Sequence, residues 1–140
     1  MSTAVFPGSF DPVTTGHVDL ICRASRMFDR LVVGVLVNSA KDPLFSQEER
    51  VAMLQEIVKD QDNITVCSFE GLLVDFVRQQ KADAIIRGLR SSGDFEYELP
   101  LAQANYKMNQ NADTVFLATA PEYSYISSSA VRELLRYQAD

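Results

Sequence analysis

The sequence is poor in the residues from which proteins build metal centres and disulfides. Its 140 residues include one histidine, His17, and two cysteines, Cys22 and Cys67. A single histidine without clustered cysteines argues against a zinc site built from protein side chains. The cysteines fall in a predicted helix and a predicted strand, where buried free thiols are expected, and such thiols fit a reducing cytoplasm.

The sequence also lacks an excess of positive charge and lacks long hydrophobic runs. It has 13 Lys and Arg but 19 Asp and Glu, which gives a net charge of −6. This acidic balance argues against non-specific binding to nucleic acid or membranes. No apolar run is long enough to span a bilayer, and Met1-Ser2-Thr3 lacks the basic start of a secretory signal. We therefore expect a cytoplasmic protein. The 46% of hydrophobic residues suffices for one domain with a core, over residues 1–140.

Short apolar runs alternate with stretches of helical periodicity. The runs predict strands at residues 4–6, 31–38, 64–67, 84–86 and 115–117. The periodic stretches predict helices at 17–28, 47–58, 71–80, about 94–108 and 129–137, with Met27, Ile57 and Leu72 among the core-facing positions. Runs such as Leu31–Val37 are apolar on both faces, which is typical of parallel sheets. The fold class is α/β, with a doubly wound, five-stranded parallel sheet.

The stretch from Phe6 to His17 joins the first strand to the first helix and reads FPGSFDPVTTGH. In a parallel α/β sheet, such a turn lies at the edge where ligands bind. The free N–H groups at the start of the helix suit an anion, above all a phosphate. His17 falls in the first helical turn, where the helix dipole favours a neutral imidazole that donates a hydrogen bond. The alternative is a histidine that only caps the helix.

Charged residues follow other strands and should meet at the same edge of the sheet. Arg87 and Arg90 flank Gly88 directly after the fourth strand. Their partners are either a phosphate in the cleft or the carboxylates of Asp94 and Glu98, and their position opposite the first turn favours phosphate. Lys41 follows the second strand, although on its own it is simply a surface lysine.

Hydroxyl groups gather before the last helix, in Ile126-Ser127-Ser128-Ser129. One reading is plain capping of the helix N-terminus. The other is a second phosphate site on the cleft edge. Spacing alone does not choose between them. Asp11, which precedes Pro12, is read as a turn former.

Several of these stretches resemble one enzyme family. Gly8-Ser9-Phe10-Asp11-Pro12 followed by Thr14-Thr15-Gly16-His17 is similar to the first signature of the T/HxGH nucleotidyltransferases, in the form seen in bacterial phosphopantetheine adenylyltransferases. The segments 126–132 (ISSSAVR), 87–98 (RGLRSSGDFEYE) and 45–50 (FSQEER) resemble further signatures of these enzymes. The resemblance thus extends over nearly the whole chain, and it implies a Rossmann-like nucleotidyltransferase fold.

The resemblance implies a reaction and its partners. Members of the family transfer the adenylyl group of ATP to 4′-phosphopantetheine and release dephospho-CoA and pyrophosphate, a step of coenzyme A synthesis. They use Mg²⁺, which we expect the ATP phosphates to hold, with no metal site on the protein. The family also implies a cytoplasmic homohexamer, with coenzyme A as a feedback ligand and without nucleic-acid or membrane partners.

The resemblance further implies roles for individual residues. His17 stabilises the transition state, with Lys41 and Arg90 as further catalytic groups. The residues implied in binding 4′-phosphopantetheine are Ser9, Lys41, Leu73 and Arg87. Those implied in binding ATP are Ser9, Phe10, His17, Gly88, Leu89, Arg90, Glu98, Tyr123, Ser124, Tyr125, Ile126, Ser127, Ser128 and Ser129.

Other readings stay open at this point. A nicotinate mononucleotide adenylyltransferase or a cytidylyltransferase would share the first signature, and a nucleotide-binding module would bind ATP without turnover. Pro100 lies inside the helix that carries Glu98 and is expected to kink it, which would displace Glu98. Relatives carry a further C-terminal segment, so we expect the chain to be truncated after Asp140.

Overall fold

Five parallel strands form one sheet at the centre of the computed structural model, which describes residues 1–38, 42–124 and 127–139. The strands are β1 (Thr3–Gly8), β2 (Arg30–Val37), β3 (Ile64–Glu70), β4 (Ala84–Leu89) and β5 (Asp113–Ala118), in the spatial order β3-β2-β1-β4-β5. The chain starts in the middle of the sheet, builds one edge and then returns to build the other. This order confirms the predicted doubly wound α/β class.

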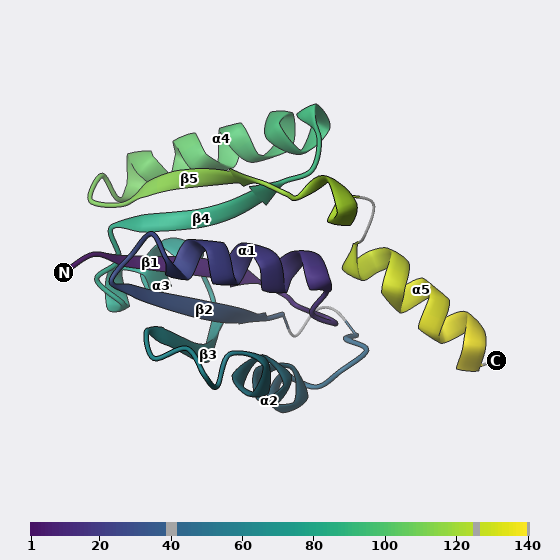
Figure 1. The fold of residues 1–140 in the computed structure, drawn as a ribbon. Coiled ribbons are helices and arrows are strands. Elements are labelled where there is room, and N and C mark those ends of the chain that lie inside the picture. Colours follow the sequence, from purple (N-terminus) through teal and green to yellow (C-terminus); the bar gives the residue numbers. More distant parts are fainter. Residues whose placement is uncertain (39–41, 125–126, 140) are drawn as a thin grey trace.

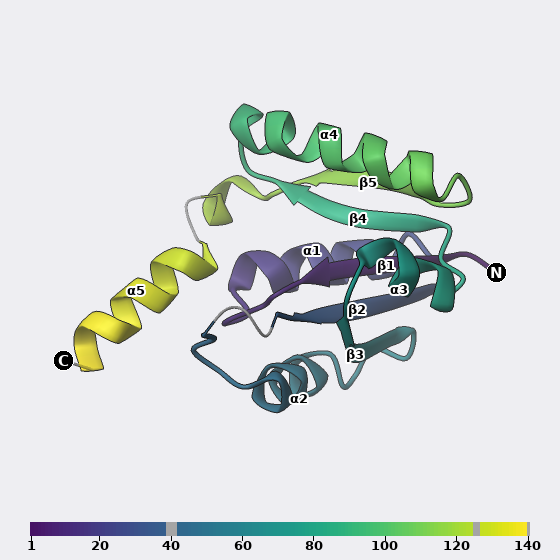
Figure 2. The same ribbon diagram turned by 180° about the vertical axis from the view of Figure 1, so that it is seen from behind.

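The helices cover both faces of the sheet (Figures 1 and 2). On one face lie α1 (Thr15–Ser25) and α2 (Gln47–Ile57), whose Ile21 and Leu54 are fully buried against the strands. On the other face lies α3 (Leu73–Gln79), together with α4 (Ser92–Met108), whose Phe95 meets Phe116 of β5. The chain ends with a short 3₁₀ turn (Pro121–Tyr123) and α5 (Ser128–Ala139), which projects away from the sheet (Figure 1).

The alternation of side chains along the strands produces two hydrophobic layers. Val33 and Val35 of β2 face α1 and α2, whereas Val32 faces α3 on the opposite side. Gly34 also faces α3, where Phe69 and Phe76 stack with ring centroids 4.4 Å apart. A Cβ at Gly34 would lie 2.7 Å from the Phe76 ring, so this close packing requires glycine.

Several predicted details of the elements were wrong. The thiols of Cys22 and Cys67 are half-buried instead of buried. Met27 is 54% exposed because α1 ends at Ser25, whose hydroxyl donates to the Cys22 carbonyl of the last turn. Leu72 is exposed because it precedes the first residue of α3, and Ile57 is exposed at the last residue of α2. No helix within the described ranges has the length and apolarity needed to cross a bilayer.

Candidate functional site

A cleft of about 690 Å³ opens at the carboxyl ends of β1 and β4, beside the N-termini of α1 and α5. The predicted convergence of distant residues on one edge is confirmed, because residues from five different segments line this cleft. Those among the predicted site residues are Ser9, Phe10, His17, Arg87, Gly88, Arg90, Glu98, Tyr123, Ser127, Ser128 and Ser129. Gly88 brings Leu20 of α1 close to β4, since a Cβ there would lie 2.4 Å from Leu20 Cδ1.

The turn between β1 and α1 shapes the centre of the cleft. Phe10 adopts a left-handed conformation, with φ of 48°, and is only 2% exposed. Its ring packs between the Phe6 ring, at 5.9 Å between centroids, and the His17 ring, at 5.0 Å in a T-shaped arrangement. Left-handed backbone is unfavourable for a residue with a bulky side chain. Packing against Phe6 and His17 therefore helps to hold this turn in place.

His17 is held by a reciprocal cap at the start of α1. The His17 N–H donates to Thr14 Oγ1 at 3.3 Å, and the Thr14 N–H donates to His17 Nδ1 at 3.0 Å. Because Nδ1 accepts a hydrogen bond, the proton of the neutral imidazole lies on Nε2. The capping role considered for His17 is thus confirmed, and it leaves a second nitrogen free to act as a donor.

The charge state of His17 follows from its surroundings. Burial and, to a smaller extent, the positive charge of Arg90 together lower the pKa of His17 to about 4. The predicted neutral imidazole is therefore supported at neutral pH. The main cause is burial, whereas the sequence pointed to the helix dipole.

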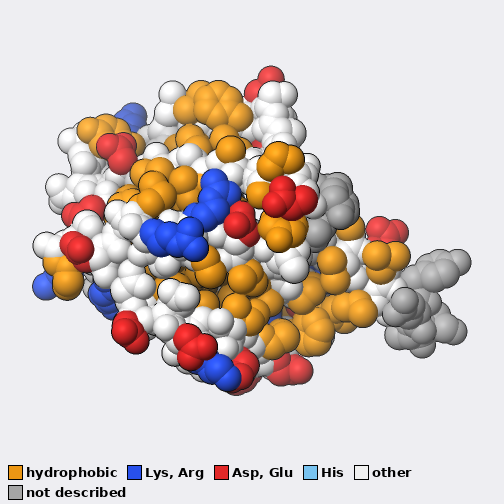
Figure 3. Space-filling model, in the orientation of Figure 1, with side chains coloured by type: hydrophobic (Ala, Val, Ile, Leu, Met, Phe, Trp, Pro, Cys, Tyr) orange, Lys and Arg blue, Asp and Glu red, His pale blue; other side chains and the backbone are white. Residues whose placement is uncertain are grey.

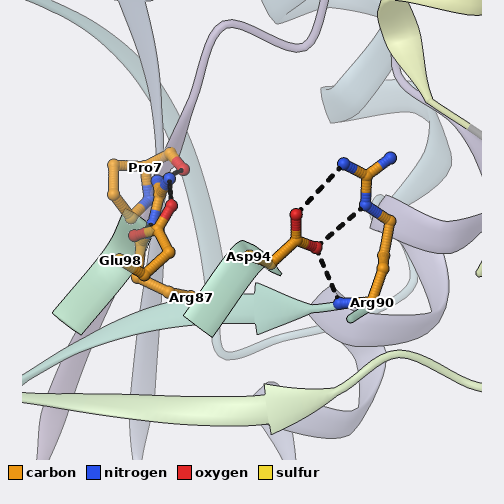
Figure 4. A network of polar contacts seen from close by, with 5 residues as sticks. All are labelled: Pro7, Arg87, Arg90, Asp94 and Glu98. Carbon is orange, nitrogen blue, oxygen red and sulfur yellow. Dashed lines mark hydrogen bonds and ion pairs between the residues drawn. The ribbon is translucent and has the colours of Figure 1, made fainter. Parts of the chain in front are cut away.

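Arg87 and Glu98 form a two-pronged ion pair across the cleft wall (Figure 4). Arg87 Nε lies 2.9 Å from Glu98 Oε2, and Nη2 lies 2.6 Å from Oε1. Arg87 Nη1 also donates to the Pro7 carbonyl at 3.4 Å, which ties β4 to β1. The Glu98 side chain is 11% exposed and the Arg87 side chain 33%. α4 continues through Pro100 as one helix, and Glu98 lies at the cleft.

Arg90 pairs in the same way with Asp94, one helical turn before Glu98 (Figure 4). The Asp94 carboxylate accepts from the Arg90 backbone N–H at 2.8 Å and from Arg90 Nε at 3.1 Å. Burial alone would raise the pKa of Asp94, but the hydrogen bonds from Arg90 outweigh it and hold the pKa below its usual value. The ion pairs considered as the alternative for both arginines are thus present, and both arginines still line the cleft.

The N-terminus of α5 closes the cleft through polar contacts with the first turn. Ser127 Oγ accepts from the Ala130 N–H, as an N-cap does, and Ser128 Oγ donates to the Pro12 carbonyl at 2.7 Å. Arg132 donates to the Asp11 carbonyl at 2.6 Å and to Ser129 Oγ at 3.0 Å. The capping reading is confirmed at Ser127, while phosphate binding by the three serines stays a prediction.

Some predicted residues do not line the cleft. Leu73 packs against the hydrophobic layer under α3, and Leu89 and Ser124 also fall outside the lining. Lys41, Tyr125 and Ile126 lie outside the described residues. The binding roles of all six stay predictions.

Other residues at the site were given no binding or catalytic role from the sequence. Arg132, Asp94, Tyr97 and Thr119 line the cleft. The first three lie within segments that carry the family resemblance, and this was the available signal. Asp11 does more than form a turn, because its buried carboxylate accepts from the N–H groups of Leu44 and Phe45, both at 2.9 Å.

Acidic side chains are scarce around the cleft. Asp94 and Glu98 line it, and each is engaged by an arginine. Within the part of the chain that the structure describes, no group of three or more His, Cys, Asp or Glu could hold a metal ion. The described cleft residues thus present arginine, imidazole and hydroxyl donors, a set suited to phosphates.

Comparisons with known proteins agree with this picture. Residues 5–134 match the cytidylyltransferase-like family. The whole chain is 53% identical to a phosphopantetheine adenylyltransferase of Lachnoclostridium phytofermentans and covers 86% of it. With the enzyme of the same name from Clostridium tetani it shares 50% identity over 98% of the chain and 86% of the relative.

Solved structures show the same fold at low sequence identity. A nicotinic acid mononucleotide adenylyltransferase of Plasmodium falciparum superposes with a TM-score of 0.68 over 96% of this chain and 83% of its own, at 16% identity. A lipopolysaccharide core biosynthesis protein of Thermoplasma volcanium does so with a TM-score of 0.65 over 86% and 98%, at 23% identity. With its sheet order, its cleft and these relatives, the chain belongs to the cytidylyltransferase-like nucleotidyltransferases and, among them, to the phosphopantetheine adenylyltransferase family.

Proposed function

We propose that this protein transfers the adenylyl group of ATP to 4′-phosphopantetheine, in a reversible reaction that yields dephospho-CoA and pyrophosphate. The observation that carries the proposal is the meeting of His17, Arg87 and Arg90 at one cleft of about 690 Å³. His17 comes from the first turn of α1, Arg87 from the end of β4 and Arg90 from the residue after β4, so the fold, not local sequence, brings them together.

The chemistry requires alignment more than covalent help. An oxygen of the acceptor phosphate attacks the α-phosphorus of ATP in line, and the bond to the leaving pyrophosphate breaks. The acceptor phosphate is already anionic near neutral pH, so no strong general base is needed. The protein contributes by holding the two anions together and stabilising charge at the α-phosphate.

His17 is suited to the stabilising role. Its Nδ1 is committed to the Thr14 N–H, so Nε2–H is the donor on the ring that lines the cleft. We assign Nε2–H to a non-bridging oxygen of the α-phosphate. This donor is already oriented before reaction, so it acts most strongly where charge develops in the transition state.

The two arginines are suited to different ligands. We assign Arg87 to the acceptor phosphate and Arg90 to ATP, as the family resemblance implies for these two positions, which lie on either side of Gly88 at the end of β4 and just after it. Each guanidinium has more donors than its carboxylate partner uses, so it can meet a phosphate without losing that partner.

Mg²⁺ is the cofactor that we propose, held mainly by the ATP phosphates. Asp94 and Glu98 of the cleft are both engaged by arginines and do not form a dedicated metal site. This arrangement fits a metal ion that is held by the ATP phosphates. When bound, the metal would neutralise part of the triphosphate charge. We further propose a cytoplasmic homohexamer, with coenzyme A as a feedback ligand.

Pyrophosphate release tests the reaction. With ATP and Mg²⁺, release should depend on added 4′-phosphopantetheine and should not occur with pantetheine, which lacks the attacking phosphate. Nicotinate mononucleotide as acceptor and CTP as donor test the neighbouring activities of the superfamily. Binding of ATP without release under any of these conditions would overturn the proposal and favour a nucleotide-binding module.

A further inference from the structure

Arg50 is a buried arginine that lies outside the cleft but contacts the turn that shapes it. It belongs to the first turn of α2 and is 4% exposed. Its Nη1 donates to the carbonyl of Ser9 at 2.8 Å and to the carbonyl of Leu36 at 3.2 Å, and its Nε lies 3.4 Å from the carbonyl of Ser46. One guanidinium thus joins the β1–α1 turn, the end of β2 and the start of α2.

The chemistry of these contacts is unusual for a buried charge. A buried guanidinium is costly unless it is paired, and carboxylates are its strongest partners. Within residues 1–38, 42–124 and 127–139, Arg50 forms no ion pair with a carboxylate. Its partners are backbone carbonyls from three segments, which the planar guanidinium contacts with donors held in fixed directions.

The position of the Ser9 carbonyl links Arg50 to the catalytic centre. The next residue, Phe10, has the left-handed backbone conformation, and its ring packs against the His17 ring. An unfavourable backbone conformation persists only where its surroundings fix it. Arg50 fixes this turn at the carbonyl that immediately precedes the left-handed residue.

A second bridge connects the same two segments. The Asp11 carboxylate, on the β1–α1 turn, accepts from the N–H groups of Leu44 and Phe45, just before α2. The turn is therefore anchored to the β2–α2 region on both sides of Phe10, by Arg50 at Ser9 and by Asp11.

We propose that Arg50 is a positioning residue for adenylyl transfer, which holds the Ser9–Phe10 turn and, through Phe10, the His17 imidazole in the geometry that the reaction needs. This inference rests on the proposed function. Arg50 itself touches no substrate. Its loss should therefore lower the rate at saturating substrate more than the affinity for either substrate.

Two variants and one control test the inference. Arg50→Met removes every side-chain hydrogen-bond donor and keeps most of the side-chain volume. Arg50→Lys keeps the positive charge but lacks the planar guanidinium group. Glu49→Ala is the control, because it breaks the cap of α2, in which Glu49 accepts from the Ser46 N–H, and leaves the contacts to Ser9 and Leu36 intact. Thermal melts and steady-state kinetics with both substrates are measured for all three and for the parent.

We expect kcat to fall by on the order of 10- to 100-fold in Arg50→Met, as for small misplacements of a reacting group. Arg50→Lys should show a smaller but clear fall, while Glu49→Ala should keep the parent kcat despite a lower Tm. The inference is wrong if kcat of Arg50→Met stays within about twofold of the Glu49→Ala value. If Arg50→Met does not fold, parent-like kcat in Arg50→Lys overturns it in the same way.

A second readout does not depend on turnover. His17 is the single histidine of the chain, so its imidazole can be titrated by NMR without overlap. In the Arg50 variants a displaced turn should expose the ring and raise its pKa from about 4 towards 6.5. An unchanged His17 pKa in Arg50→Lys would contradict the inference about Arg50. If the parent protein does not catalyse the reaction, only the proposed function is refuted.

Discussion

His17 divides its two functions between its two ring nitrogens. Nδ1 closes the cap of α1 by accepting from the Thr14 N–H, and this fixes both the tautomer and the direction of the ring. Nε2–H is left for a ligand in the cleft, and the Phe10 ring packs against the imidazole from the turn. The capping contact therefore prepares the donor and does not compete with it.

Replacing His17 should separate these two functions. We predict that His17→Ala lowers kcat by on the order of 10²–10³, as for loss of an oxyanion-hole donor, with much smaller changes in the KM of ATP and 4′-phosphopantetheine. It should also cost about 1 kcal/mol of stability, because the Thr14 N–H loses its acceptor. Steady-state kinetics and urea unfolding measure the two effects.

His17→Gln is the matched control, since glutamine at this helix position can close the same cap. We expect its stability to be close to that of the parent. Its kcat should remain reduced at least tenfold, because the glutamine amide does not place an N–H donor where His17 Nε2–H lies. Recovery of kcat in His17→Gln would leave His17 as a cap without a catalytic role.

The lowered pKa of His17 also predicts how stability depends on pH. The folded chain keeps His17 neutral down to about pH 4, whereas the free imidazole binds a proton below 6.5. Between these values the unfolded chain binds more protons, so the free energy of unfolding falls as the pH drops from 6.5 towards 4, by up to roughly 3 kcal/mol. Above pH 6.5 this contribution is fully present.

Urea unfolding of the parent and of His17→Gln across pH 4–8 isolates this effect from that of the carboxylates. The difference between the two proteins should change between pH 4 and 6.5 and stay constant above it. The acid limb of the kcat profile should likewise lie near pH 4. An acid limb near pH 6.5 would mean that His17 has an ordinary pKa and an open environment.

At the scale of elements, α1 and α2, which both begin with a reciprocal capping box, show what local sequence can predict. Ser46 followed three residues later by Glu49 is the usual capping-box pattern, and both hydrogen bonds of this cap of α2 are present, at 3.1 and 3.0 Å. The cap of α1 has the same geometry but uses His17 in place of an acidic or amide side chain, so the usual pattern did not reveal it. A local pattern predicts a contact only where the residue types are the usual ones.

Contacts between elements were beyond local patterns. Arg87 and Glu98 were both noted in the sequence, but whether the arginine meets this carboxylate or only a phosphate depends on how β4 and α4 pack. The same holds for Arg50, whose partners lie 41 and 14 residues away along the chain. The doubly wound parallel sheet and the shared edge could be predicted, because buried apolar runs alternate with helices and the carboxyl ends of parallel strands meet at one edge.

The β4–α4 pairs lead to a prediction about the division of labour between the arginines. Arg87→Ala should weaken 4′-phosphopantetheine binding chiefly, and Arg90→Ala should weaken ATP binding chiefly, each by roughly 1.5–3 kcal/mol where the contact is shielded from water. Calorimetric titration of each variant with each ligand measures this. Equal losses for both ligands in both variants would rule out the division.

Glu98→Gln provides the control for Arg87→Ala. Removing Arg87 leaves the Glu98 carboxylate, whose side chain is 11% exposed, as a nearly buried charge without its ion-pair partner. We expect Arg87→Ala to destabilise the fold by about 1–3 kcal/mol and Glu98→Gln to recover part of that loss in the double variant. Ligand affinities that recover together with stability in the double variant would show that Arg87 acts through folding alone.

At the scale of the whole molecule, charge and shape set the conditions for the site. The net charge is −6, yet Arg87, Arg90 and Arg132 gather at the cleft, so anionic substrates are attracted locally against the overall field. Hydrophobic side chains cover the surface between α1 and the base of the projecting α5 (Figure 3). On α5 itself, Leu134 is 65% exposed and Leu135 39%. A helix of this length is marginal in water without a packed apolar face, so α5 suits a molecule that packs against other copies.

The proposed homohexamer makes this testable in solution. Light scattering after size exclusion should give six times the chain mass of 15.6 kDa over a wide range of protein concentration. Leu134→Asp should shift the mass towards smaller species, because a charge would replace an apolar side chain in the packed face. Glu133→Gln, at an exposed neighbouring position, should leave the mass unchanged. A monomeric mass for the parent at high concentration would exclude the hexamer, whereas an intact hexamer in Leu134→Asp would place the subunit contacts on other elements, such as α4 with its exposed Leu101 and Tyr106.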